Sequence, residues 1–147
     1  MAVINPYLNF PGNCEEAFNF YKSVFGGDFT YVGRFGEMPP DPNFTMTDDE
    51  KNKIMHISLP VSQETVLMGS DSGGEWAPDM VVGNNISISI NTSTKEEADR
   101  LFNGLANGGK ITMPIDKVFW GDYFGMCIDK FGINWMVSFN ENQIPQS

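Results

Sequence analysis

One pattern, a strand followed by a helix, occurs twice along this chain of 147 residues. Residues 5–10 alternate polar with apolar side chains and lead into a helical pattern that begins at Asn13. Residues 85–90 alternate in the same phase and lead into a second helical pattern that begins at Thr94. The spacing is 80 residues between the strands, from 5 to 85, and 81 between the helices, from 13 to 94. A duplicated module is the simplest explanation, and it limits both the fold and the place where a ligand can bind.

The helical patterns carry signals for both of their ends. Asn13 and Thr94 are each followed three residues later by a glutamate, which predicts capping of the first free amides. Glycine pairs at 26–27 and 108–109 predict where the helices end, because glycine accepts the left-handed conformation common at a helix C-terminus. Three strand patterns follow each helix, at residues 29–35, 54–61 and 65–69 and at residues 110–113, 123–128 and 133–139.

These elements predict an α+β fold, made of two βαβββ modules within a single domain. The first module spans residues 1–70, the second spans residues 84–141, and residues 71–83 connect them. Residues 36–53 interrupt the first module as a long loop that contains three prolines. Because loops of more than about 12 residues are often functional, this segment is a candidate lid.

The charge balance argues against nucleic acid as a partner. The net charge is −10, the pI is near 4.3, and the nine basic residues are scattered, whereas a phosphate backbone needs a basic surface. Cys14 and Cys127 lack the spacing of a disulfide framework or a metal site, so we expect reduced thiols and a cytoplasmic location. The sequence shows neither a leader pattern nor an apolar run of about 18 residues, so we expect no membrane partner.

Several short motifs resemble those of a known superfamily. In chain order they are PYLNF at 6–10, GN at 12–13, EA at 16–17, FY at 20–21, FGG at 25–27, FGEMP at 35–39, FWGD at 119–122, FG at 124–125, DKFG at 129–132 and WM at 135–136. With these motifs the chain resembles the vicinal oxygen chelate superfamily, which includes glyoxalase I, extradiol dioxygenases and the fosfomycin and bleomycin resistance proteins. More narrowly it resembles the PhnB-like branch, over nearly its whole length.

The resemblance implies a homodimer in which each module forms a curved mixed sheet, with a helix on the convex side and a cavity on the concave side. The strand alternation fits this fold, because it separates an apolar set expected to face the helices from a polar set on the other face. The apolar set is Leu8, Phe10, Ile86, Ile88 and Ile90. An ordinary solvent-facing surface would give the same alternation.

The resemblance also implies where a metal ion would bind. Members of the glyoxalase type hold a divalent metal with four side chains, from the first and last strand of each module. Alignment of the strand patterns puts Asn5, Leu67 or Met68, Asn85 and Met136 in these four positions. Asparagine is a weak neutral ligand for such ions and methionine is a soft one, so we expect that the metal site is lost and that no cofactor is needed.

His56 is the only histidine, and it lies on the strand face opposite Met55, Ile57 and Leu59. An imidazole in the cavity would be a candidate catalytic acid or base near neutral pH. The alternative is a histidine that only hydrogen-bonds a neighbouring strand. We expect the ligand-binding residues to be Asn5, Tyr7, His56, Ser58, Asn85, Ser87, Trp120, Asp122, Asn134 and Met136. Glu37, at the mouth of the long loop, would belong to a lid over the cavity.

These residues favour metal-independent binding of a small organic molecule in the cavity. The rival hypothesis is an enzyme, an isomerase, lyase, dioxygenase or transferase for a small oxygenated metabolite, with His56 as acid or base. The third hypothesis is a metalloenzyme whose metal site is rearranged around His56 and a carboxylate such as Glu64. Members of this branch are sometimes labelled methyltransferases of the ubiquinone pathway. A Rossmann methyltransferase needs a glycine-rich loop after its first strand, and residues 10–13 contain one glycine, which argues against that activity.

Overall fold

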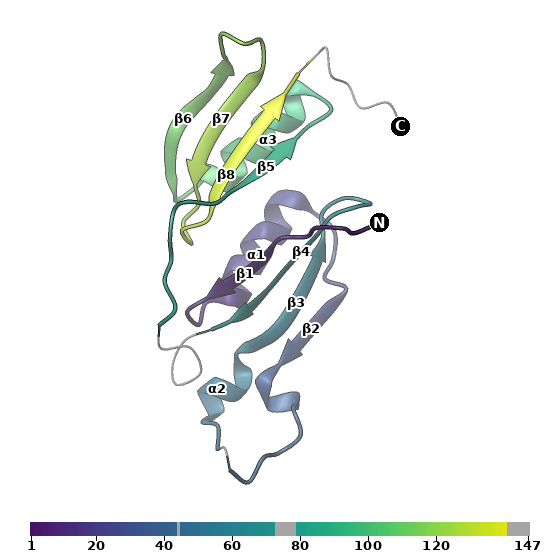
Figure 1. The fold of residues 1–147 in the computed structure, drawn as a ribbon, viewed down its shortest axis with the longest axis vertical. Helices are drawn as coiled ribbons and strands as arrows, with labels where there is room; N and C mark the ends of the chain where they lie inside the picture. The colour runs from purple at the N-terminus through teal and green to yellow at the C-terminus, as the bar shows by residue number, and fades with distance from the viewer. Residues whose placement is uncertain (44, 73–78, 141–147) are drawn as a thin grey trace. The chain divides into compact units, whose positions relative to one another are not determined.

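The computed structural model describes residues 1–43, 45–72 and 79–140. The chain divides into two compact units, Met1–Val81 and Val82–Ser147 (Figure 1). The elements of the first unit are β1 (Tyr7–Phe10), α1 (Cys14–Phe25), β2 (Tyr31–Arg34), the 3-10 helix η1 (Phe35–Glu37), α2 (Asp48–Asn52), β3 (Ile54–Pro60) and β4 (Val66–Asp71). Those of the second unit are β5 (Ser87–Asn91), α3 (Lys95–Ala106), β6 (Lys110–Lys117), β7 (Tyr123–Ile128) and β8 (Asn134–Phe139).

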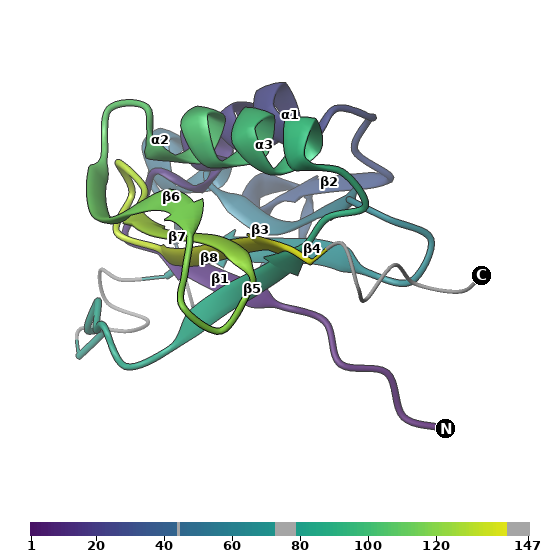
Figure 2. The same cartoon turned by 90° about the horizontal axis from the view of Figure 1, so that it is seen from above.

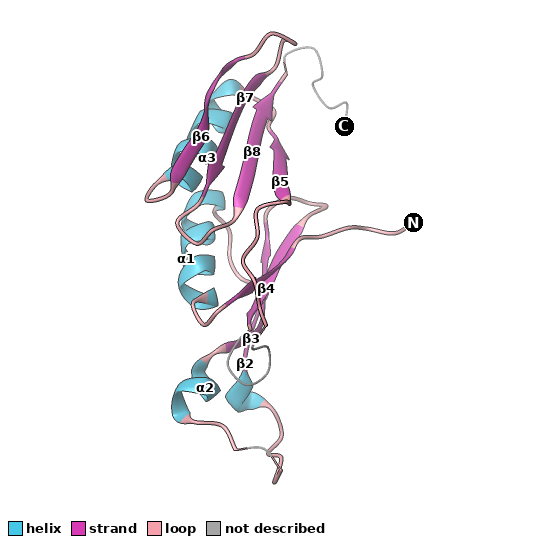
Figure 3. Cartoon of the chain, turned by 60° about the vertical axis from the view of Figure 1, so that its left-hand side comes forward, coloured by secondary structure: helices cyan, strands magenta, loops and turns pink. Residues whose placement is uncertain are grey.

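Both units contain a four-stranded mixed sheet with the same topology. The strand order is β1-β4-β3-β2 in the first sheet and β5-β8-β7-β6 in the second. In each sheet the first strand of the unit pairs in parallel with its last strand, and the other pairs are antiparallel. Helix α1 covers one face of the first sheet, and α3 covers one face of the second (Figures 2 and 3). The predicted α+β fold of two βαβββ modules is therefore confirmed.

The two helices bury the same stripe of side chains. Each has 12 residues, and three buried positions recur at a spacing of 81: Ala17, Tyr21 and Val24 in α1, and Ala98, Phe102 and Leu105 in α3. These positions follow the period of an amphipathic helix that packs on a sheet. The repeat seen in the helical sequence patterns is thus also a repeat of packing.

The two helix N-termini are satisfied in different ways. Thr94 caps α3 as predicted, because its hydroxyl accepts a hydrogen bond from the Glu97 amide at 3.1 Å. Asn13 makes no such bond, so the prediction for α1 is wrong. The first amide of α1, that of Cys14, donates instead to Asp71 Oδ1 at 2.8 Å, and the other oxygen of Asp71 accepts from the Ile54 amide. A carboxylate on β4 therefore replaces the local cap.

The strand repeat is offset by 82 residues rather than 80. Tyr7 lies opposite Met68 in the first sheet, and Ser89 lies opposite Met136 in the second. Because the shift of two residues preserves the alternation of faces, Leu8, Phe10, Ile88 and Ile90 still point toward the helices as expected. Ile86 does not, because β5 begins at Ser87 and leaves Ile86 76% exposed before the strand, so that expectation is wrong.

The segment from 36 to 53 contains more structure than the long loop that was expected. It begins in η1 and later forms α2, where Thr47 and Glu50 make a capping box: each side chain accepts a hydrogen bond from the other residue's amide. None of the helices in the described part of the chain is long and apolar enough to cross a membrane.

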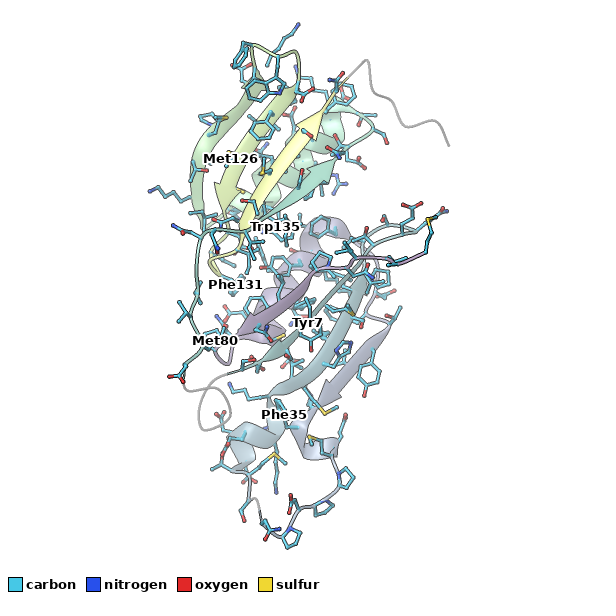
Figure 4. The ribbon with its side chains drawn as sticks, in the orientation of Figure 1. Tyr7, Phe35, Met80, Met126, Phe131 and Trp135 are labelled. Carbon is cyan, nitrogen blue, oxygen red and sulfur yellow. The ribbon has the colours of Figure 1, made fainter. Side chains whose placement is uncertain are left out.

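A buried carboxylate fixes the turn between β7 and β8. Asp129 is 3% exposed, and its Oδ1 accepts hydrogen bonds from the amides of Phe131 and Ile133 at 2.8 and 3.1 Å. Its Oδ2 accepts from the indole Nε1 of Trp135, a buried core residue labelled in Figure 4, at 2.8 Å. One side chain therefore ties the turn to the core, which explains the DKFG motif in structural terms.

Asp129→Asn tests this clamp with almost no change in shape. The amide group would keep one acceptor but turn an N–H donor toward either the indole or the turn amides. We expect a loss of about 1 to 3 kcal/mol in the free energy of unfolding, because a buried donor is left unpaired. Urea unfolding measures this loss of stability, and Asp116→Asn on the exposed strand β6 is the control. Equal midpoints for the two variants would contradict the interpretation.

An ion pair joins α1 to the end of β2. The Arg34 guanidinium donates to both carboxylate oxygens of Glu15, at 3.1 and 2.6 Å, and also to the Asn52 carbonyl at 2.7 Å. The hydrogen bond from Arg34 is the main reason that the pKa of Glu15 is lowered. The guanidinium thus connects three elements, and it connects them more strongly when Glu15 is charged.

Glu15→Gln tests the pH dependence of this connection. Because the folded-state pKa of Glu15 is lowered, the pair stabilises the fold above the unfolded pKa of about 4.3, and this contribution is lost as the pH falls through the lower folded value. The free energy of unfolding of the wild type should exceed that of the variant by less than about 1 kcal/mol at neutral pH, since both side chains are partly exposed. This difference should shrink as the pH falls below the unfolded pKa. Urea unfolding at several pH values measures it, and Glu64→Gln is the control. A difference independent of pH would contradict the assignment.

Candidate functional site

The face of the first sheet opposite α1 carries a continuous row of side chains. Register pairs join Tyr31 to Ser58, Ser58 to Met68 and Met68 to Tyr7, so the row crosses all four strands. We call this surface the first open face; its residues are Tyr7, Asn9, Tyr31, His56, Ser58, Met68 and Ser70. It is the best-defined candidate site because it brings together histidine, hydroxyl groups and aromatic rings from separate parts of the chain.

A bulge in β3 sets the direction of His56. Gly33 pairs with His56 whereas Arg34 pairs with Ile54, so Met55 is an extra residue in β3. Ile54 is consequently buried on the helix side together with Ile57 and Leu59, and Met55 is only half-buried. Met55 is therefore less buried than Ile57 and Leu59, and His56 lies on the open face as expected. Bulges commonly redirect side chains next to functional sites.

His56 has a hydroxyl group beside each ring nitrogen and two tyrosine rings near its imidazole. Nδ1 lies 3.3 Å from the Tyr7 hydroxyl, and Nε2 lies 2.9 Å from the Ser58 hydroxyl. The imidazole centroid is 5.6 Å from the Tyr7 ring and 5.7 Å from the Tyr31 ring. Tyr7, labelled in Figure 4, is 44% exposed and Tyr31 is 49% exposed. The histidine is thus positioned within the sheet, while the two tyrosines keep surface available for contact.

Gly33 makes room for the Tyr31 ring. A Cβ at position 33 would lie 2.7 Å from Tyr31 Cε1 and 2.8 Å from its hydroxyl oxygen. Glycine inside a strand weakens it, and such a residue often marks a place where another group must approach closely. Here that group is a side chain from the same strand, which passes over Gly33 toward His56. Neither Tyr31 nor Gly33 was predicted as a site residue, although the alternation of 29–35 placed both on one face.

The face of the second sheet opposite α3, which we call the second open face, has a different chemistry. It includes Ser87, Ser89, Asn91, Phe124, Met126, Asn134, Met136 and Ser138. Met126, labelled in Figure 4, pairs with Met136 on β8 and with Met113 on β6. Asn134 donates to the Ile86 carbonyl at 3.1 Å. The middle of this face is therefore apolar, and its polar residues are concentrated along β5 and β8.

One polar contact occurs at equivalent positions of both open faces. The Ser70 hydroxyl donates to Asn9 Oδ1 at 3.3 Å in the first, and the Ser138 hydroxyl donates to Asn91 Oδ1 at 2.7 Å in the second. Each bond joins the two parallel strands of its sheet. The same contact is thus present in both modules, and its role is structural because it links neighbouring strands.

Trp120 and Asp122 form part of the turn between β6 and β7. Asp122 Oδ2 accepts from Trp120 Nε1 at 3.0 Å, and Oδ1 accepts from the side-chain amide of Asn140. Trp120 remains 52% exposed and packs against the rings of Phe119 and Phe124. The carboxylate that was predicted to accept from a ligand therefore already holds the turn, whereas the indole still presents an open surface.

The remaining predicted residues lie outside these two clusters. Asn5 Oδ1 accepts from the Val66 amide at 2.9 Å, which extends the pairing between the two strands. Asn85 is exposed and precedes β5. Glu37 lies at the end of η1 and accepts from the Arg34 amide at 3.0 Å. Its role in a lid stays a prediction.

The two cysteines are poor candidates for nucleophiles. Both are buried, and burial raises their pKa, to about 11 for Cys127. Negative charge adds to the effect, from Asp71 at Cys14 and from Asp129 at Cys127. Because the thiolate is the reactive form, these thiols are inert near neutral pH.

The donors at the predicted metal positions do not fit a hard divalent ion. Met68 and Met136 supply thioether sulfurs. The residues that pair with them on the neighbouring strands, Tyr7 and Ser89, supply only neutral hydroxyl groups. Zinc, manganese and iron(II) prefer imidazole and carboxylate ligands to neutral hydroxyl or thioether groups. In the part of the chain that the structure describes, no three His, Cys, Asp or Glu side chains are grouped to hold a metal ion.

Comparisons with known proteins identify one matching family model and several solved structures with a similar fold. The model of the family described as 3-demethylubiquinone-9 3-methyltransferase matches residues 2–138. Protein PA1353 from Pseudomonas aeruginosa is 40% identical, with a TM-score of 0.78 over 95% of this chain and 98% of that one. A putative 3-demethylubiquinone-9 3-methyltransferase, PhnB protein, from Bacillus cereus is 27% identical, with a TM-score of 0.72 over 92% and 98%. A glyoxalase-related enzyme from Fulvimarina pelagi, 20% identical over 95% and 88%, shares the fold with a TM-score of 0.61.

Gly33→Ala tests the packing of Tyr31 on His56. The new methyl group should push the flexible Tyr31 ring away and so remove its ring-current effect on the imidazole. Because His56 is the only histidine, its ring protons are readily assigned in an NMR spectrum. We expect these proton resonances to shift in Gly33→Ala and to stay unchanged in Gly83→Ala, where a Cβ makes only ordinary contacts. Unchanged resonances in both variants would mean that the ring does not stack in solution.

Proposed function

The chain belongs to the family described as 3-demethylubiquinone-9 3-methyltransferase, within the PhnB-like branch of the vicinal oxygen chelate superfamily, and we propose that it binds a small organic molecule without a metal ion. The observation that carries the proposal is the arrangement on the first open face, where His56 is held between Tyr7 and Tyr31. Half-exposed tyrosine rings beside a fixed polar group are typical of sites that bind planar molecules.

The chemistry of this face favours an uncharged ligand. Among the described residues, no charged side chain hydrogen-bonds to Tyr7, His56 or Ser58. The protein also carries a net charge of −10, which repels anions at long range. A neutral planar molecule would gain contact area from the rings and hydrogen bonds from the hydroxyl groups at little electrostatic cost.

The proposal does not extend to methyl transfer. A Rossmann methyltransferase binds its cofactor at a glycine-rich turn between a strand and a helix of a parallel sheet. Here residues 11–13 connect β1 to α1 with one glycine, and each four-stranded sheet contains one parallel pair.

We propose that the second open face also takes part in ligand binding. Asn134 and Met136 would supply it with an amide and an apolar centre, and Trp120, in the turn beside Phe124, with an aromatic plane. We propose in addition that the protein works in the cytoplasm as a homodimer, and native mass spectrometry measures the subunit count directly.

Binding to small aromatic probes tests the proposal. NMR titrations with acetophenone, benzamide, phenol and indole should shift resonances of the first open face. Tyr31→Leu should weaken the binding of the best probe about tenfold, or 1.4 kcal/mol, because it removes one ring. Phe29→Leu is the matched control, since Phe29 packs on Lys22 of α1. The proposal fails if no probe binds, or if the two variants weaken binding equally.

The rival hypothesis, an enzyme that uses His56 as acid or base, predicts a different result. His56→Ala would then abolish turnover of a bound compound while its affinity stays within about tenfold. A loss of affinity without any turnover by the wild type would favour binding alone.

A further inference from the structure

Three groups form one hydrogen-bonded chain across the first open face. The Ser58 hydroxyl lies 2.9 Å from His56 Nε2, and His56 Nδ1 lies 3.3 Å from the Tyr7 hydroxyl. A neutral imidazole has one N–H donor and one acceptor nitrogen. The chain therefore has a direction: either Ser58 donates to His56 and His56 to Tyr7, or the reverse.

The burial of the two hydroxyl groups distinguishes these directions. Ser58 is 8% exposed, and among the described residues its hydroxyl has no hydrogen-bond partner besides His56 Nε2. If Nε2 carried the proton, the Ser58 hydroxyl would accept it and leave its own buried proton without an acceptor, which is unfavourable. Tyr7 is 44% exposed, so its hydroxyl proton can always reach solvent or a ligand.

We propose that Ser58 fixes neutral His56 as the Nδ1–H tautomer, and that Tyr7 therefore presents its hydroxyl proton to the ligand. In this arrangement Ser58 donates to Nε2, Nδ1–H donates to the Tyr7 oxygen, and the Tyr7 proton points away from the chain. Tyr7 then determines specificity, and His56 is a positioning residue that acts through it.

The arrangement defines the class of ligand. The Tyr7 hydroxyl accepts a hydrogen bond from His56 and has its own proton left to donate, so it selects a ligand with a hydrogen-bond acceptor. The flanking rings select a planar molecule. The expected ligands are neutral conjugated or aromatic compounds with a carbonyl group. This part of the inference rests on the proposed function, whereas the tautomer does not.

The tautomer is measured on the free protein. Long-range 1H–15N NMR of the neutral imidazole shows which nitrogen carries the proton, and the single histidine makes the assignment unambiguous. We expect the proton on Nδ1 in the wild type and a shift toward Nε2 in Ser58→Ala. Ser70→Ala is the matched control, because Ser70 lies on the same face but donates to Asn9. A wild-type proton on Nε2, or equal spectra for Ser58→Ala and the wild type, would overturn the inference.

The ligand class is measured with two probes of similar size. Acetophenone offers a carbonyl acceptor, and phenol is mainly a donor. We expect the wild type to prefer acetophenone by about fivefold, and Tyr7→Phe to lose this preference while phenol binding stays within about twofold. Ser58→Ala should reduce the preference as well, which a merely structural role would not do.

The outcomes separate the two proposals. An Nδ1–H tautomer without binding of either probe would refute the proposed function and the ligand class but support the hydrogen-bonded chain. Binding of both probes with an Nε2–H tautomer would support the function and overturn the chain. A preference for phenol would overturn the assigned ligand class.

Discussion

The parallel pairing of first and last strand is the interaction on which each module depends. It joins residues 7–10 to residues 68–71 in the first sheet and residues 87–91 to residues 134–138 in the second. Such a pairing needs a crossover, which α1 and α3 supply while they cover one face. It also brings Tyr7 into the same sheet as His56, which lies 49 positions further along the chain. Without it neither the core nor the first open face would form.

The sequence was sufficient for those features that depend on local patterns. Helix ends at Thr94 and Gly26 and the alternation around Phe10 all follow from residues close in the chain, and they led to the correct fold. His56 and Ser58 were placed on the correct face for the same reason, because side chains two residues apart in a strand share a face.

Features that depend on pairing between distant segments were missed. The cap of α1 comes from Asp71, which no local pattern around Asn13 reveals. The bulge at Met55 exists only relative to β2, and the approach of Tyr31 to His56 requires the register between the two strands. Likewise, the structural role of Asp122 depends on Asn140, which lies 18 residues further along the chain. In each case the missing information was which backbone lies next to which.

The repeat at Asn9–Ser70 and Asn91–Ser138 shows which positions the two modules share and which have diverged. With this bond as the reference, Tyr7 corresponds to Ser89 and Ser58 to Met126, because Met68 and Met136 are their common neighbours. His56 lies two residues before Ser58, and Phe124 lies two residues before Met126, so His56 corresponds to Phe124. The second module has therefore kept the scaffold and replaced every member of the hydrogen-bonded chain. The chain thus contains two copies of one scaffold but a single tyrosine–histidine–serine group, so it would bind one ligand molecule of this kind rather than two.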